Sequence, residues 1–409
     1  MKRVVITGMG IISPIGNDLE TVVKALFSNR SGITSMEEWR RIKGLGVTSA
    51  GVAGGYDPKR IHRKERRTMG KMAVMAAIAA LDALDQAGVA PSVVASPCTG
   101  VAMGSTTGSG EVIEKMFTDF AETGGISRLE GTTFMKIMNH SVSANIAAML
   151  GTRGRVLSPC SACATSTQSI GEGFETIQSG FQEVMICGGA DELHPSTAGV
   201  FDVLHAASKG GDDPAASPRP FDRNRDGLVV GEGAGAVVLE ALDHARERGA
   251  EILGEVTGYS TCCDGSHMTS PRPGGMKRSM DQALESAGCK ISEIDYINAH
   301  ATGTVMGDIA EAEAIHQVAG KRIPVSGTKG FTGHTLAASG VMEVIFSLLM
   351  MKHNFIAPTL NLENIDPRCD NILHVQRRMD RQIDRIMTSN FAFGGINATL
   401  ILKRWNNRP

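Results

Sequence analysis

Short apolar runs alternate along this chain with longer segments in which alanine and leucine recur at helical spacing. The short runs have the length of buried strands, which we expect at residues 3–6, 100–103, 184–187, 234–239 and 294–299. The longer segments predict helices at residues 71–87, 169–180, 307–319 and 341–352. Strands that alternate with helices indicate an α/β fold whose sheet is mostly parallel and covered by helices.

The chain is long enough to divide into two parts. Its 409 residues can hold two core-sized units or one large fused unit. The best joint follows a helix predicted at 242–248, so we expect one half at 1–249 and another at 250–409. A weak internal repeat agrees with this division, because each half has a strand ending in a short turn before a helix: Ser161-Ala162-Cys163 and Asn298-Ala299-His300.

Composition and charge narrow the class of protein. The net charge of −2 provides no global field that attracts nucleic acid. The first ten residues lack the apolar segment of a signal peptide, and the apolar run at 341–351 is short and contains Glu343, which indicates a buried helix. We therefore expect a soluble cytoplasmic protein with no membrane anchor, whose eight cysteines are free thiols.

The segment LSPCSACATSTQSI contains the strongest candidate for a nucleophile. Cys163 lies where an extended stretch passes into a helix of small residues. Backbone N–H groups at a helix start stabilise a thiolate and predict a lowered pKa, and the N–H of Cys163 is available to an oxyanion. A buried structural cysteine is the alternative. Cys160 and Cys163 also form a CxxC, as in a redox pair or half of a zinc site, but no second CxxC completes the ligand set.

Two glycine- and threonine-rich segments hold candidate acid–base groups. His300 follows a predicted strand in DYINAHATGTVMGD. Lys329 and His334 lie in VSGTKGFTGHTLAASG, before the helix that contains Glu343. A single histidine is usually structural, whereas two neutral imidazoles near a cysteine can donate N–H groups to a thioester carbonyl or take up a proton. These segments therefore predict acyl chemistry.

Three further motifs carry weaker signals. SNFAFGGINAT places Phe391 and Phe393 before two glycines that let the backbone approach a ligand, although two core aromatics at strand spacing are an equal alternative. DRNRDG begins like a calcium loop, but Gly233 stands where the bidentate glutamate belongs. The dinucleotide-like pattern at residues 8–10 has Ser13 at its third glycine position. We set aside calcium and nicotinamide functions.

Taken together, the segments resemble the β-ketoacyl-acyl carrier protein synthases of the elongating type (I and II). The resemblance spans the chain and rests on the blocks SACATS, RPFDRNRDGLVVGEGAG, NAHATGT, GTKGFTGHTLAASG and NFAFGG. It implies a thiolase-like fold, a five-layer αβαβα sandwich of two similar halves, usually homodimeric. It also implies decarboxylative condensation of an acyl group with malonyl-acyl carrier protein to a 3-oxoacyl-acyl carrier protein, in fatty acid or polyene and polyketide elongation, without a metal or redox cofactor.

The resemblance also implies roles for single residues. Cys163 matches the acyl-accepting nucleophile, and His300 and His334 match the histidines that stabilise the enolate as CO2 leaves. The other matches are Lys329 as a supporting lysine, Glu343 as the carboxylate that organises its loop, Phe393 as a gate whose N–H completes the oxyanion hole, Thr302, Thr304 and Thr269 as contacts for the pantetheine arm, and Phe391, Thr107 and Phe201 as further substrate contacts.

A basic segment is the candidate surface for the acidic carrier protein. Residues 59–67 are the densest basic run in the chain and are followed by Lys71. Taken alone, the run is equally well a solvated helix face. In the resembling synthases such a segment receives the carrier protein, and Lys64 and Arg67 fall on the matching positions.

The sequence also departs from the family pattern. Ala301 and Ala337 stand where the family commonly has glycine, which puts the shape of the substrate in question. The type I and type II features are mixed, so subtype, chain length and pathway stay open. A coenzyme A-dependent thiolase would use a second catalytic cysteine, and a silent chain-length partner would lack Cys163. A heterodimer with a related subunit is the alternative to a homodimer.

Overall fold

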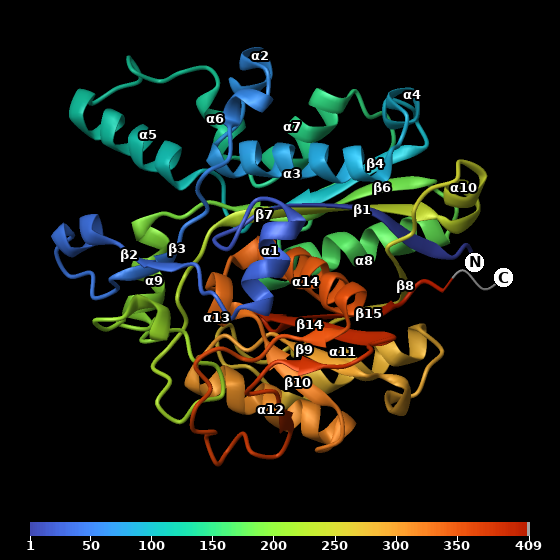
Figure 1. The fold of residues 1–409 in the computed structure, drawn as a ribbon. Helices are drawn as coiled ribbons and strands as arrows, with labels where there is room; N and C mark the ends of the chain where they lie inside the picture. The colour runs from blue at the N-terminus through green and yellow to red at the C-terminus, as the bar shows by residue number, and fades with distance from the viewer. Residues whose placement is uncertain (407–409) are drawn as a thin grey trace.

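A mixed sheet of eleven strands runs through the centre of the molecule (Figure 1). The computed structural model describes residues 1–406. The strand order is β12-β10-β9-β14-β15-β8-β1-β7-β6-β4-β5. The strands are β1 Val4–Ile12, β4 Thr99–Gly104, β5 Val156–Leu157, β6 Val184–Asp191, β7 Gly233–Ala241, β8 Gly254–Cys263, β9 Tyr296–Ala299, β10 Pro324–Gly327, β12 Leu373–His374, β14 Arg385–Ala392 and β15 Ile396–Lys403.

This sheet contains the same five-strand arrangement twice. The first half has the order β5-β4-β6-β7-β1 and the second has β10-β9-β14-β15-β8, joined where β1 pairs with β8. In each half the first three strands of this order are parallel, the fourth (β7 or β15) is antiparallel to both of its neighbours, and the fifth therefore runs in the direction of the first three. The internal repeat is therefore a duplicated fold. The sheet as a whole is mixed, so the expectation of a mostly parallel sheet holds only within each half, where one strand of five is reversed.

The duplication also corrects the pairing of turns. Counted along the chain, the first half has β1, β4, β5, β6 and β7, and the second has β8, β9, β10, β14 and β15. Cys163 follows the third of these strands in its half, β5, whereas His300 follows the second in its half, β9. The turn equivalent to that of Cys163 follows β10 and comprises residues 335–339. Sequence similarity could not reveal this equivalence, because the two turns read SACAT and TLAAS.

Helices cover both faces of each half-sheet and give five layers (Figure 1). Two helices cover the outer face of the first half, two lie between the halves, and two cover the outer face of the second: α3 Lys71–Ala87 and α7 Ser141–Leu150; α8 Thr165–Gln178 and α14 Ser339–His353; α11 Pro273–Ser286 and α12 Val305–Ala319. This is the five-layer αβαβα sandwich that the family resemblance implied. The other helices named in this article are α2 Arg63–Arg66, α5 Gly110–Thr123, α6 Thr133–Ile137, α10 Leu242–Glu247 and α13 Lys329–Thr332.

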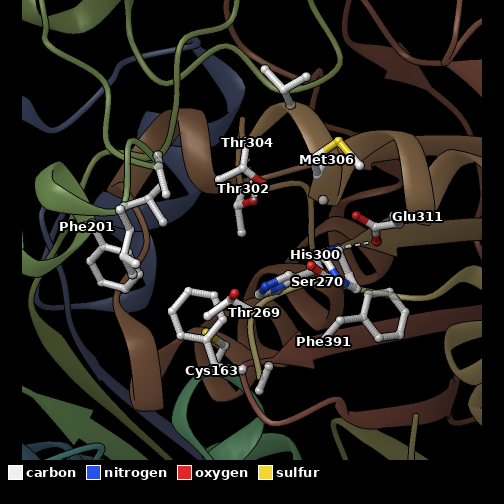
Figure 2. A pocket seen from close by; sticks show the side chains of 18 of the residues that line it. Cys163, Phe201, Thr269, Ser270, His300, Thr302, Thr304, Met306, Glu311 and Phe391 are labelled. Atoms are coloured by element: carbon white, nitrogen blue, oxygen red, sulfur yellow. Dashed lines mark hydrogen bonds between the residues drawn. The ribbon is translucent and has the colours of Figure 1, made fainter. Parts of the chain in front are cut away.

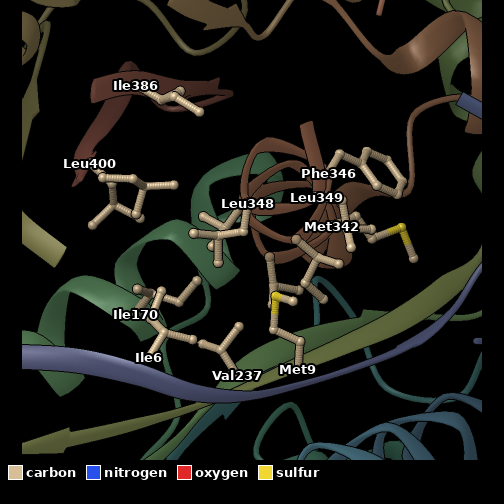
Figure 3. Close-up of a cluster of buried hydrophobic side chains, with 14 of the residues drawn as sticks. Ile6, Met9, Ile170, Val237, Met342, Phe346, Leu348, Leu349, Ile386 and Leu400 are labelled. Carbon is tan, nitrogen blue, oxygen red and sulfur yellow. The ribbon is translucent and has the colours of Figure 1, made fainter. Parts of the chain in front are cut away.

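The largest hydrophobic cluster fills the middle layer (Figure 3). Met342 and Phe346 of α14 pack with Ile170 of α8, between sheet residues of both halves such as Val237 and Leu400. The stretch from 336 to 353 is apolar enough to cross a membrane, but 89% of it is buried inside the fold. The prediction of a buried helix is confirmed. Each large side chain removed from water here contributes about 1.5–3 kcal/mol.

The elements lie where the apolar pattern places them, but their ends differ. Helix α3 has the predicted bounds because Gly70 precedes it and Gly88 closes it in the left-handed conformation. Helix α8 starts four residues before its predicted start, at Thr165, because its first turn consists of small hydroxylated residues that apolar spacing does not mark. Strand β1 extends to Ile12 through its two glycines.

Those two glycines explain the dinucleotide-like pattern at the N-terminus. A Cβ on Gly8 would lie 1.9 Å from the carbonyl oxygen of Ala83, and one on Gly10 would lie 2.0 Å from that of Ala79. Both carbonyls belong to α3, so the glycines allow the helix to approach the strand closely. Their function is packing and involves no phosphate.

Candidate active site

The candidate residues meet at the ends of strands from both halves. Strand β5 is followed by a 3-10 turn (Ala162–Ala164) that carries Cys163 to the start of α8. Strand β9 ends directly before His300, and β10 leads to Lys329, the first residue of α13, and then to His334. Residues that the sequence singled out on three separate segments are thus brought together.

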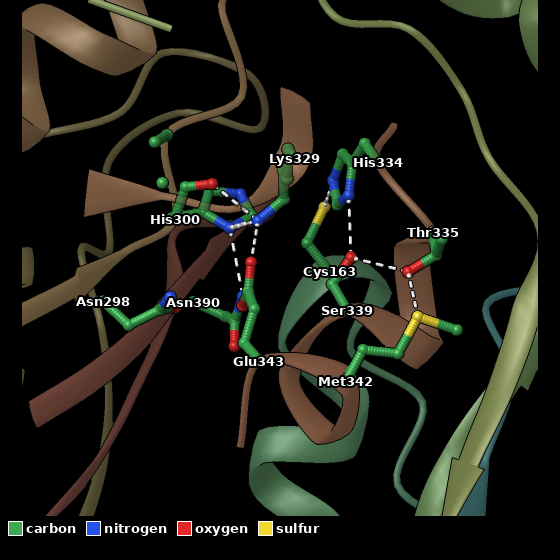
Figure 4. Close-up of polar contacts among 12 residues, drawn as sticks. Cys163, Asn298, His300, Lys329, His334, Thr335, Ser339, Met342, Glu343 and Asn390 are labelled. Atoms are coloured by element: carbon green, nitrogen blue, oxygen red, sulfur yellow. Dashed lines mark hydrogen bonds and ion pairs between the residues drawn. The ribbon is translucent and has the colours of Figure 1, made fainter. Parts of the chain in front are cut away.

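His334 lies against the candidate nucleophile (Figure 4). Its Nε2 is 2.9 Å from Cys163 Sγ. On the other side of the ring, Nδ1 accepts the backbone N–H of Leu336 at 3.3 Å and lies 2.9 Å from Ser339 Oγ. A backbone N–H can only donate, so the lone pair of the neutral ring is on Nδ1 and its proton is on Nε2. His334 therefore directs an N–H toward the sulfur.

His300 is held in the same tautomer by different partners. Its Nδ1 lies 3.2 Å from Lys329 Nζ and 3.1 Å from Asn390 Nδ2, both of which are donors. Lys329 also donates to Glu343 Oε1 at 2.5 Å, and Asn390 donates to Glu343 Oε2 at 2.8 Å. The proton of neutral His300 is therefore also on Nε2. The two imidazoles lie 5.2 Å apart, at 84° to one another.

Burial sets the protonation states of this site. Burial, together with the charge of Lys329, lowers the pKa of His300 and His334 well below the usual value, so both rings are neutral. Burial also raises the pKa of Cys163 to about 12. The expectation that the helix start lowers this pKa is wrong, because desolvation of the buried sulfur outweighs the charge of Lys329. The resting site holds a thiol beside two neutral N–H donors.

The same three side chains have the spacing of a metal site. The sulfur of Cys163 and one ring nitrogen each of His300 and His334 all lie within 4.8 Å of one another. A metal ion needs a lone pair on each nitrogen, but both Nε2 atoms carry protons. If the protons moved to Nδ1, the one on His334 would face the N–H of Leu336 and the one on His300 would face the ammonium of Lys329, so donor would meet donor at both rings. The arrangement fits N–H donation, and a metal does not fit it.

Cys160 does not share the environment of Cys163. All eight cysteines are free thiols, as expected. Cys160 is exposed, and its sulfur lies 3.6 Å from the carbonyl oxygen of Thr106 and 3.4 Å from Asn139 Nδ2. Because it does not line the cavity described below, the CxxC spacing does not place two thiols at one site.

A cavity of about 280 Å³ leads to Cys163, His300 and His334 (Figure 2). Its walls include residues expected as substrate contacts, together with the expected gate Phe393: Thr269, Thr302, Thr304, Phe201 and Phe391. Thr107 is exposed and does not line this cavity. Lys64 and Arg67 are exposed on and just after α2 and do not line it either.

The two alanines that replace common glycines lie beside the site but not in it. Ala301 and Ala337 are fully buried, and neither lines the cavity. The Cβ of Ala301 occupies the space beside Gly327, where a second Cβ would approach to 2.3 Å. The expectation that these methyl groups reshape the substrate cavity is therefore not met. They pack against the protein itself.

Sequence reasoning missed several residues that hold the site. Asn390 belongs to the segment SNFAFGGINAT, but an amide within a predicted strand does not indicate that it contacts His300. Glu311 accepts the backbone N–H groups of His300 and Ala301 at 2.6 and 2.7 Å, and burial raises its pKa to about 8. The sequence does contain an indication of the role of Glu311: an ionisable side chain between two alanines in a helix predicted to be buried needs hydrogen-bond partners.

The wall of the cavity mouth is strongly apolar, which the sequence did not indicate. Leu204, Met268, Val305 and Met306 line the cavity while remaining substantially exposed. Thr302 and Thr304 also line the cavity, and Thr302 is buried and Thr304 half-buried where Met306 is exposed (Figure 2). The entrance thus presents apolar surface, and the interior presents hydrogen-bonding groups.

The duplicated five-layer fold, with a Cys–His–His site between its halves, defines a thiolase-like protein. The profile of "Beta-ketoacyl synthase, N-terminal domain" matches residues 1–245, and that of "Beta-ketoacyl synthase, C-terminal domain" matches residues 253–363. The chain belongs to the β-ketoacyl synthase family.

Individual relatives are similar over their whole length. The 3-oxoacyl-[acyl-carrier-protein] synthase 1 of Haemophilus influenzae is 39% identical over 99% of this chain and 100% of its own length. A β-ketoacyl synthase structure from Burkholderia phymatum is 39% identical, with a TM-score of 0.96 over 99% of this chain and 100% of its own. A type II polyketide ketosynthase, solved in complex with its acyl carrier protein, is 27% identical with a TM-score of 0.91, over 99% of this chain and 100% of its own.

Proposed function

We propose that this chain is a 3-oxoacyl-acyl carrier protein synthase that condenses an acyl group held on Cys163 with a malonyl group in fatty acid or related chain elongation. One observation carries the proposal: the sulfur of Cys163 and one ring nitrogen each of His300 and His334 lie within 4.8 Å of one another, and both neutral rings have their proton on Nε2. Two neutral donors aimed at one point suit a carbonyl oxygen that becomes an enolate. A thiolase or a redox pair would need a second cysteine there.

Acyl transfer comes first. The sulfur of Cys163 attacks the thioester carbonyl of the acyl carrier protein, and the bond from carbon to the pantetheine sulfur breaks. The thiol proton leaves with that pantetheine sulfur, so no external acid or base is consumed. Backbone N–H groups of Cys163 and Phe393 bind the tetrahedral oxyanion, and the N–H of His334 stabilises the sulfur as its proton departs.

Condensation follows when malonyl-acyl carrier protein enters the cavity. His300 and His334 donate their Nε2–H groups to its thioester carbonyl as the carboxylate leaves as CO2. The resulting carbanion attacks the acyl-cysteine carbonyl, forms the new carbon–carbon bond and displaces the cysteine sulfur. The Cys163 thiolate takes up one proton from water, which balances the charge of the carboxylate lost as CO2, and the product is a 3-oxoacyl thioester. Lys329 and Glu343 keep the His300 proton on Nε2 throughout.

The substrates arrive on an acidic carrier protein. Thr302 and Thr304, whose hydroxyls are 3.0 Å apart, line the cavity with Thr269 and hold the pantetheine arm. Phe393, whose ring centroid lies 5.8 Å from that of Phe201, is the gate of the cavity. Lys64 and Arg67 form the docking surface for the carrier protein. A similar ketosynthase has been solved with its carrier protein bound.

The halves at 1–249 and 250–409 act as one catalytic unit in the cytoplasm, and this unit pairs with a second copy. The partner covers the outer face of α5 and α6, where Phe117 and Phe134 are 63% and 68% exposed. Strand β5 is the last strand at this end of the sheet, and an edge strand can pair with another chain. Thr107 precedes α5 in the chain. A second copy would bury the exposed phenylalanines and continue the sheet.

The histidines provide the test of this mechanism. His300→Ala or His334→Ala removes an oxyanion donor worth about 3 kcal/mol, so malonyl decarboxylation should fall roughly a hundredfold or more. Acylation of Cys163 should fall much less, because that step relies on backbone donors. Release of CO2 from malonyl-carrier protein measures the first step, and mass spectrometry of the protein measures the second. Decarboxylation at the native rate in either variant would refute the assigned role.

A further inference from the structure

The two halves contain the same turn at equivalent places. In the first half, Ala162 has φ +46° in the 3-10 turn that precedes α8. In the second half, Leu336 has φ +50° in a 3-10 turn (Leu336–Ala338) that precedes α14. A positive φ is uncommon for a residue with a side chain, so its recurrence marks the same local structure. By this register Ala337 is the counterpart of the nucleophile Cys163.

The counterpart turn already binds an anionic group. The backbone N–H of Ala337 donates to Asp191 Oδ2 at 2.8 Å. Asp191 is the last residue of β6, is 3% exposed, and also accepts the hydroxyl of Thr106 at 2.6 Å and its backbone N–H at 3.1 Å. An internal carboxylate thus occupies in the second half the place that a substrate oxyanion takes at Cys163 in the first.

This carboxylate lies one step from the His334 ring. The backbone N–H of Leu336, the residue before Ala337, donates to His334 Nδ1. The hydroxyl oxygen of Ser339, two residues after Ala337, lies 2.9 Å from the same nitrogen. These contacts keep the His334 proton on Nε2. Fixing Ala337 therefore fixes the short segment that sets the tautomer and direction of the imidazole.

We propose that Asp191 is a positioning residue for the condensation reaction: by filling the oxyanion-like turn at Ala337, it holds the segment that orients His334 toward the substrate carbonyl. This inference rests on the proposed function of the site. Asp191 touches neither the substrate cavity nor the reacting atoms and acts through the backbone of residues 336–339. Thr106 ties it in turn to the loop after β4.

The neighbouring residue offers a matched control. Glu192 is also a buried carboxylate at the end of β6, but it accepts the backbone N–H of Met72 at 3.1 Å and the hydroxyl of Ser109 at 2.7 Å. It therefore connects the starts of α3 and α5 and does not contact the His334 segment. A purely structural role for buried carboxylates here would make both residues equally important for catalysis.

The test compares Asp191→Asn with Glu192→Gln at pH 8, where the wild-type carboxylate is ionised, since burial raises the pKa of Asp191 to about 7. Steady-state condensation with malonyl-carrier protein gives kcat and KM, and mass spectrometry gives the rate of Cys163 acylation. Asp191→Asn should lower kcat tenfold or more, with KM and the acylation rate within threefold of the wild type. Glu192→Gln should keep kcat within twofold.

The outcomes separate this inference from the proposed function. Absence of condensation by the wild type would reject the proposed function itself. Condensation by the wild type with kcat of Asp191→Asn within twofold, or an equal loss in Glu192→Gln, would reject the positioning role. If Asp191→Asn does not fold, Thr106→Val removes only one donor to the carboxylate and should lower kcat about threefold at unchanged KM. An unchanged kcat would again reject the role.

Discussion

The tautomer of each histidine in this site is set by the groups that contact its Nδ1, on the side of the ring away from the substrate. His300 and His334 have different partners at Nδ1, an ammonium and an amide in one case and a backbone N–H in the other, yet both end with the proton on Nε2. The same principle explains why three metal-type ligands within 4.8 Å do not make a metal site. The residue types alone, read from the sequence, could not distinguish these cases.

Glu311 makes the stability of the fold dependent on pH. Its pKa is raised by burial to about 8, against an ordinary value of 4.5, so the folded state retains a proton that the unfolded state releases. The stabilisation is complete below pH 4.5 and is lost as the pH rises through 8. We expect the free energy of unfolding to fall between pH 6 and pH 9, and Glu311→Gln to reduce that fall by about 1 kcal/mol or more.

Urea unfolding of both proteins at the two pH values measures this difference. Burial raises the pKa of Asp191 and Asp308 as well, to about 7 and about 6, so part of the fall should persist in the variant. Equal pH dependence in the wild type and Glu311→Gln would mean that Glu311 is already ionised in the folded protein.

At the scale of helices and strands, local sequence patterns predicted where the elements lie. Contacts between distant segments determined the strand directions and the residues that support the site. The alanine spacing predicted the bounds of α3, and apolar runs predicted the positions of β4 and β6. Strand direction was not predictable, because β7 and β15 pair with segments far away in the chain. The candidate site was largely predicted because Cys163, His300, Lys329 and His334 carry reactive groups. Asn390 and Asp191 were missed because they act only through neighbours that folding brings to them.

At the scale of the whole molecule, net charge gives little information about partners. The overall charge is −2, so an acidic carrier protein must meet a local surface. Lys64 and Arg67 lie exposed with Lys59, Arg60 and Arg63, whereas Arg66 is half-buried and donates to the carbonyl of Ile61. Arg60 forms an ion pair with Asp82. Such clustered charges accelerate encounter over a Debye length of about 8 Å at physiological salt.

Reversing these charges should weaken carrier-protein binding selectively. We expect Lys64→Glu with Arg67→Glu to raise KM for carrier-protein substrates severalfold or more, with a smaller effect at high salt. Acylation by a small thioester without the carrier protein should stay nearly unchanged. The control reverses Lys24 and Lys321, two exposed cations on other helices and turns, which changes the net charge equally. A similar rise in KM for both pairs would place the docking surface elsewhere.

Acyl capture by one particular sulfur tests the central claim most directly. The wild type, Cys163→Ala and Cys160→Ala are each incubated with a panel of acyl-loaded carrier proteins, and the protein mass and its modified peptide are measured. We predict one acyl group on Cys163 in the wild type and in Cys160→Ala, because Cys163 lines the cavity, 2.9 Å from His334 Nε2, and Cys160 does not. Cys163→Ala should remain unmodified and should form no 3-oxoacyl product. An acyl group on Cys160, or equal loss in both variants, would contradict the mechanism.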